Sequence, residues 1–136
     1  MLITAVSLYL LCALALAALS LKYLLGPAPS DYHREILVSA DVELAQTITG
    51  LFKALNTVIG SGFLAIAIGV ATLAWFGVRE DLLWAKLAVV TLGLIAGIPG
   101  SVAAKRLEQA TGVKTPWRPG FAMTALVVVA FLLSII

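Results

Sequence analysis

Four long apolar segments with almost no charge dominate this sequence of 136 residues. They cover residues 2–25, 54–76, 82–98 and 119–136, and their only charged residues are Lys22 and Lys86. A helix needs about 20 apolar residues to cross the hydrocarbon core of a bilayer. Charged residues make up only 12% of the chain, about half of their share in soluble domains. The sequence therefore predicts an all-α membrane protein.

Four membrane spans leave little of the chain for any other domain. We predict a single domain, residues 1–136, that forms a four-helix transmembrane bundle with spans at about residues 2–25, 44–77, 82–104 and 119–136. The first segment is interpreted as a mature helix, because no Lys or Arg precedes it and its apolar run is longer than that of a typical signal peptide.

Basic residues are distributed unequally between the two ends of the predicted helices. Seven lie in or beside the first and third loops: Lys22, Arg34, Lys53, Lys105, Arg106, Lys114 and Arg118. The opposite end has only Arg79 and Lys86. The positive-inside rule therefore predicts that the first and third loops are cytoplasmic and that both termini lie on the non-cytoplasmic side.

Small residues recur every four positions on two of the segments. The two stripes are Ser61, Ala65 and Gly69 on the second segment, and Gly93, Gly97 and Ser101 on the third. Small residues allow helices to approach closely in lipid, and a short turn joins these two segments. We therefore predict that the stripes pack against each other, with a seam between two or three copies of the chain as the alternative.

The third segment also carries signals for where its helix is interrupted and where it ends. We expect Pro99 and Gly100 to break the helix, because proline removes a backbone hydrogen bond and clashes with the preceding turn. Two further helical turns, with Ser101 as a possible cap, would then end at Gly112.

A polar stripe precedes and enters the second span. On a helical wheel that begins near Asp41, its members fall on one side: Glu43, Gln46, Gly50, Lys53, Asn56, Thr57 and Gly60. In one interpretation Lys53 reaches the inner headgroups while Asn56 bonds a neighbouring helix. In the other, the stripe lines a cavity that faces the cytoplasm and receives a polar or anionic group, because polar residues are costly to bury in a membrane.

The first loop predicts a short amphipathic helix. Pro27 and Pro29 end the first span, and Ser30 or Asp31 could cap the helix that follows. His33, the only histidine, has no second nitrogen or sulfur ligand near it, and the only cysteine lies within an apolar segment. We therefore predict no metal site and no cofactor.

These patterns suggest a function without identifying a reaction. We hypothesise that a lipid-like or amphiphilic molecule contacts Lys53, Asn56 and Thr57, with four residues around the entrance: Glu43, Gln46, His33 and Arg34. No hydrolase, metalloprotease or nucleotide-binding motif is present, so we assign no catalytic residue, and a net charge of +2 gives no reason to expect nucleic-acid binding. One alternative is an accessory or scaffold subunit of a larger membrane complex, and another is a small oligomeric transporter or channel.

Two sequence stretches carry a resemblance to a known group of proteins. The stretches ALNTVIGSGFLA and WAKLAVVTLGL, with the first loop rich in Gly and Pro, resemble small DoxX-like bacterial membrane proteins of the uncharacterised kind. The resemblance implies a four-helix bundle in a bacterial inner membrane. It implies no catalytic residues. Separately, we predict membrane lipids as partners, with a homo-oligomer and a larger membrane complex as alternatives.

Overall fold

The computed structural model describes residues 1–136 and is built from helices and loops alone. Its elements are α1 (Leu2–Leu25), α2 (Asp31–Ser39), α3 (Gln46–Leu73), the π-helical turn η1 (Ala74–Val78), α4 (Leu83–Thr111) and α5 (Trp117–Ile135). Four of the helices are long and apolar enough to cross a membrane, with η1 continuing α3. The all-α class and the four candidate membrane spans are therefore confirmed.

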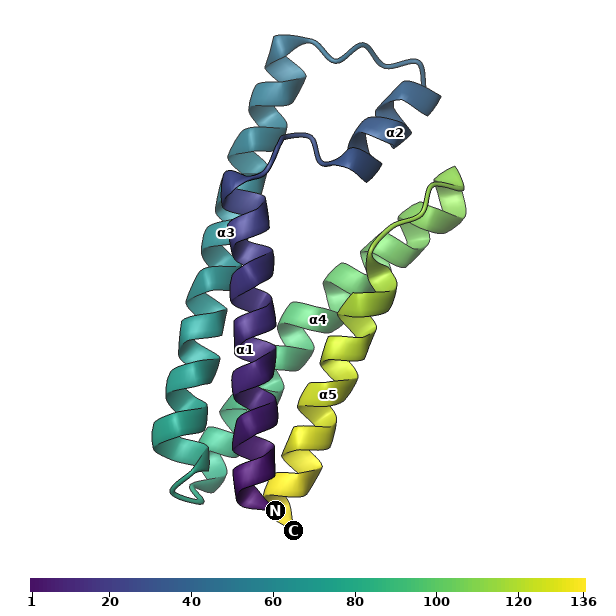
Figure 1. Cartoon of the computed structure of the whole chain (residues 1–136). Coiled ribbons are helices and arrows are strands. Elements are labelled where there is room, and N and C mark those ends of the chain that lie inside the picture. The colour runs from purple at the N-terminus through teal and green to yellow at the C-terminus, as the bar shows by residue number, and fades with distance from the viewer.

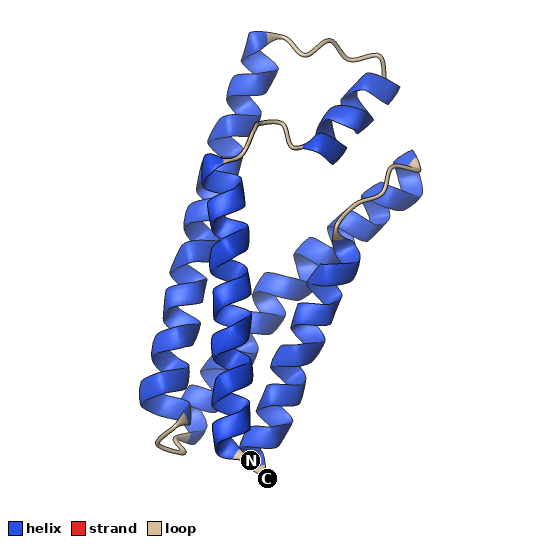
Figure 2. Ribbon diagram, in the orientation of Figure 1, coloured by secondary structure: helices blue, strands red, loops and turns tan.

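The long helices form two antiparallel pairs, which we call the N-terminal pair (α1 and α3) and the C-terminal pair (α4 and α5). Figure 1 shows that the pairs meet at the end that holds both termini, here called the closed end. They diverge toward the opposite, wide end, where α2 and the α4–α5 loop lie (Figure 1). Figure 2 shows that loops occur only at these two ends.

The structure corrects two expected helix boundaries. Helix α3 begins at Gln46 and not near Asp41, because Asp41 has a left-handed φ of 55° and residues 42–45 are not helical. Helix α4 runs through Pro99 without a break, so Ser101 lies inside the helix and caps nothing. The predicted stop is confirmed, since Gly112 has a φ of 72° and its N–H donates to the carbonyl of Glu108 at 2.9 Å.

A close backbone approach joins the N-terminal pair. The Ser20 hydroxyl donates a buried hydrogen bond of 2.7 Å to the carbonyl of Gly60. A Cβ atom at Gly60 would lie 2.7 Å from Leu24 Cγ, so only glycine permits this contact. The hydrogen bond to Gly60 satisfies the Ser20 hydroxyl at the point where α1 and α3 touch.

Small residues also join the C-terminal pair. A Cβ atom at Gly93 would lie 2.6 Å from Val127 of α5, and one at Gly97 would collide with Thr124. The predicted packing of these glycines against α3 is therefore wrong. Helix α3 is turned so that Gly60 faces α1. The small-residue stripe of α3, which is Ser61, Ala65 and Gly69, is therefore directed elsewhere.

The stripe on α3 has no partner helix within the chain. Ser61 and Ala65 are exposed, and a Cβ atom at Gly69 would meet nothing within 4 Å. Ser101, from the other predicted stripe, packs against Gly120 of α5.

The closed end holds most of the core and a buried lysine. Twelve buried apolar residues from all four long helices and η1 form one cluster there. Lys86 is 5% exposed, and its ammonium donates to the Asp81 carboxylate and to the carbonyl of Ser134 near the end of α5. A cation is favourable at a helix C-terminus, so Lys86 fastens the start of α4 to the end of α5.

Candidate functional site: a cavity between the helix pairs

The divergence of the two helix pairs leaves a cavity of about 480 Å³ between them. All four long helices and α2 contribute to its wall, and 14 of the 22 lining residues are hydrophobic. Binding pockets for small molecules are typically about 300–1,000 Å³ and mostly apolar. The size and the lining of this cavity are therefore suited to an apolar ligand.

The two walls of the cavity differ in side-chain size. Helix α4 contributes small residues, which are Gly93, Ala96, Gly97, Gly100, Ser101 and Ala104. The N-terminal pair contributes large residues, among them Leu16, Leu19, Phe63 and Ile66. The space exists because the short side chains of α4 do not reach the opposite wall.

Two tyrosines supply phenol groups to the lining. Tyr23 is near the end of α1 and Tyr32 is in α2, so both lie toward the wide end. Burial and the neighbouring Tyr23 hydroxyl raise the pKa of Tyr32. The Tyr32 phenol is therefore neutral at physiological pH and available as a hydrogen-bond donor.

His33 is packed beside this tyrosine. Its ring centroid lies 3.9 Å from that of Tyr32 and 5.2 Å from that of Phe52, and its Nδ1 atom is hydrogen-bonded to the Ser30 hydroxyl at 2.7 Å. Burial lowers the pKa of His33, which favours the neutral ring. His33 therefore holds α2 against α3 in its uncharged form.

The polar stripe expected on α3 does not form one surface. Lys53 and Thr57 are exposed, and the Thr57 hydroxyl donates to the backbone carbonyl of Lys53 at 2.9 Å. Asn56 is only 5% exposed, on the side of α3 that carries the buried Gly60. None of the three lines the cavity.

The remaining predicted residues lie at the wide end but outside the lining. Glu43 is in the linker before α3, and Gln46 is the exposed first residue of that helix. His33 and Arg34 directly follow Tyr32, so these two are adjacent to a residue of the cavity wall.

Sequence reasoning missed the cavity, although α4 carries a signal for it. Beside the small residues at every fourth position stand further small residues, as in the adjacent pairs Ala96–Gly97 and Gly100–Ser101. Such a face is wider than the seam that one neighbouring helix fills. Gly97 and Ser101 contact α5, and the other members of these pairs leave open space.

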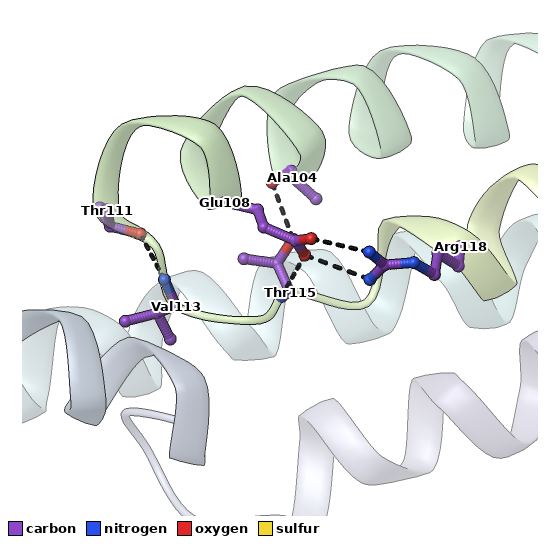
Figure 3. A network of polar contacts seen from close by, with 6 residues as sticks. All are labelled: Ala104, Glu108, Thr111, Val113, Thr115 and Arg118. Atoms are coloured by element: carbon purple, nitrogen blue, oxygen red, sulfur yellow. Dashed lines mark hydrogen bonds and ion pairs between the residues drawn. The ribbon is translucent and has the colours of Figure 1, made fainter.

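A polar network fixes the α4–α5 loop beside the cavity (Figure 3). The Glu108 carboxylate accepts from the Thr115 backbone N–H at 2.8 Å and from Arg118 at 3.0 Å. The Thr115 hydroxyl donates to the carbonyl of Ala104 at 2.7 Å. Because Ala104 and Pro116 both line the cavity, this network holds one side of its wall in place.

The four apolar helices and the cavity between them define a class, that of a multi-pass α-helical membrane protein with an apolar pocket. The chain matches no protein-family model, no curated protein and no solved structure.

Proposed function

We propose that this protein binds an amphiphilic, lipid-like molecule in the cavity between its helix pairs. The apolar chain of the ligand lies along α1 and α4, and its polar end lies at the wide end, where the phenols of Tyr23 and Tyr32 can donate to its ester oxygens. The observation that carries this proposal is a cavity of about 480 Å³ with a mainly apolar wall and tyrosines toward one end.

The chemistry of the wall supports an amphiphile over a polar solute. No Lys, Arg, Asp or Glu lines the cavity, so a small ion would have to leave its hydration shell without replacement. A hydrocarbon chain has no hydration shell to give up on entering such a cavity, and it gains close packing there. Neutral phenols can donate hydrogen bonds to an ester or to a headgroup oxygen.

We propose further that the wide end faces the cytoplasm, in an inner or plasma membrane. Seven of the nine basic residues lie in or beside the segments at the wide end. Of the two others, Lys86 is paired with Asp81, which leaves Arg79 as the unpaired basic residue of the closed end. This asymmetry supports cytoplasmic entry of the ligand from the inner leaflet.

Two glycines offer a matched pair of variants that test the ligand site. Gly100 lines the cavity and Gly62 does not, and a Cβ atom at either position would meet nothing within 4 Å. Gly100→Leu should occupy part of the cavity and obstruct an acyl chain, whereas Gly62→Leu adds the same side chain to a helix elsewhere. We expect native mass spectrometry with added phosphatidylcholine to detect bound lipid on the wild type and on Gly62→Leu, and much less on Gly100→Leu. Equal retention by all three would refute the proposal.

The single cysteine provides an independent readout of cavity occupancy. Cys12 is the only cysteine of the chain and lines the cavity, so no engineered label is needed. We expect bound phosphatidylcholine to slow alkylation of Cys12 by a membrane-permeant maleimide. An unchanged rate at saturating lipid would place the lipid outside the cavity.

A second candidate function, a subunit of a homo-oligomer or of a larger membrane complex, is favoured by one observation. The face of α3 with Ser61, Ala65 and Gly69 lies open, although small residues of this kind commonly pack against another helix in membranes. The same mass spectra test it, because a second polypeptide or a stable dimer lost on Ala65→Leu would support this candidate.

A further inference from the structure

We propose that the ligand is an anionic phospholipid whose headgroup binds at Lys105 and Trp117. This inference rests on the proposed function, which it deepens by naming the chemical class of the ligand. It assigns the headgroup to the C-terminal pair and not to the polar residues of α3.

The charge distribution at the wide end points to this side. Residues 105–118 contain four basic side chains and a single acid, Glu108. Residues 22–53, on the N-terminal pair and α2, contain three basic side chains and four acids. A net anionic headgroup is therefore attracted toward the α4–α5 loop and away from α2.

The Trp117 ring lies close to two of these basic side chains. Lys105 Nζ lies 5.3 Å from the centroid of the Trp117 ring, and Arg118 Cζ lies 4.6 Å from the same ring. Arg118 is already paired with Glu108 at 3.0 Å, whereas no carboxylate lies within ion-pairing distance of Lys105. Lys105 is exposed, so its ammonium is the free cation of this cluster.

The cluster lies next to the cavity wall. Ala104, which precedes Lys105, and Pro116, which precedes Trp117, both line the cavity wall. One lipid can therefore place its phosphate at Lys105 and its chain between the helix pairs. Tryptophan is also common at the membrane interface, where headgroups lie.

The loop that carries Trp117 is fixed before any ligand arrives. The hydrogen bonds of Thr115 to Ala104 and Glu108 hold this loop against α4. The entropic cost of ordering the site on binding is thereby reduced. Arg118 acts through Glu108 as a positioning residue, and Lys105 makes the contact with the phosphate.

The closed end provides a matched control. Arg79 Cζ lies 4.9 Å from the Trp75 ring, which is a cation–aromatic pair of the same kind, and neither residue lines the cavity. If any basic residue next to an interfacial tryptophan selected anionic lipids, Arg79→Gln and Lys105→Gln would have equal effects.

The experiment compares phosphatidylglycerol with phosphatidylcholine of the same acyl chains, added to the full chain in detergent and observed by native mass spectrometry. We expect the wild type to prefer phosphatidylglycerol, and Lys105→Gln to weaken its binding about fivefold, as for one basic residue at an anionic surface. Lys105→Arg and Arg79→Gln should keep the preference.

The outcomes distinguish failure of this inference from failure of the proposed function. Equal binding of both lipids by the wild type, or an unchanged preference in Lys105→Gln, overturns this inference and leaves the proposed function standing. Binding of neither lipid overturns the proposed function itself. Displacement of phosphatidylglycerol by inorganic phosphate would identify the ligand as a soluble anion and overturn the assignment to a lipid.

Discussion

The half-buried ion pair at the closed end leads to a prediction: replacing its exposed partner, Asp81, should destabilise the fold more than replacing its buried partner, Lys86. Lys86 has a side chain that is 7% exposed, whereas the side chain of Asp81 is 73% exposed. Asp81→Asn removes the counterion and leaves the ammonium of Lys86 buried. Removing one partner of a buried pair costs about 3–5 kcal/mol. We expect no more than about 3 kcal/mol here, because Asp81 is largely exposed and the carbonyl of Ser134 still accepts from Lys86.

Lys86→Met should lower the free energy of unfolding less than Asp81→Asn does. It removes the hydrogen bond to Ser134, and a hydrogen bond from a charged donor contributes about 1.5–3 kcal/mol. The carboxylate that remains at Asp81 is exposed and becomes solvated without a large penalty. We therefore expect a loss of about 2 kcal/mol for Lys86→Met, and about the same loss for the double variant.

The assay is reversible unfolding in mixed micelles of SDS and a mild detergent, followed by circular dichroism. Asparagine tolerates the left-handed φ of 61° at position 81, so Asp81→Asn tests the charge and not the backbone. The reasoning is refuted if Asp81→Asn is less costly than Lys86→Met. It is also refuted if the double variant loses the sum of the two single losses, because the two residues would then be energetically independent.

Three further predictions concern contacts away from this pair. Ser20→Ala should lower the free energy of unfolding by about 0.5–1 kcal/mol in the same assay, because it leaves the carbonyl of Gly60 without its buried donor. An unchanged free energy would mean that the packing of α1 on α3 does not depend on this hydrogen bond. Gly112→Ala should lower the free energy of unfolding by about 1–2 kcal/mol, because Gly112 has a φ of 72°. Gly112→Asn should lower it less, because asparagine tolerates the left-handed conformation better. Equal losses for the two variants would argue against a left-handed cap. The single imidazole signal of His33 in NMR should titrate below the ordinary histidine value, because burial lowers its pKa. Because the unfolded chain binds this proton more readily, the protection factors of the α2 amides, which correct for the intrinsic pH dependence of exchange, should fall as the pH drops below about 6.5. Protection factors that stayed constant down to pH 5 would contradict this.

Local features of the fold were within reach of the sequence. The uncharged apolar runs indicated the four long helices, the prolines at 27 and 29 preceded α2, and Gly112 ended α4. Each of these signals acts over one or two helical turns. Local chemistry is therefore sufficient to place them.

Features that depend on distant segments were not predictable in this way. The spacing of Gly93 and Gly97 identifies a face for close packing, but it does not say which helix fills that face. The burial of Lys86 depends on Ser134, which lies 48 residues further along the chain. The cavity likewise arises from the angle between the two helix pairs, which no single segment encodes.

Because the helix pairs are packed together only at the closed end, a small rotation there would move the far end of the C-terminal pair by a larger distance. From Lys86 to Lys105 the axis of α4 extends over about 28 Å, at a rise of about 1.5 Å per residue. A rotation of about 5° at the closed end would move Lys105 by about 2.5 Å, roughly half of the 5.4 Å pitch of a helix. Small repacking around Lys86 would therefore change the width of the gap between the helix pairs at the far end of the molecule.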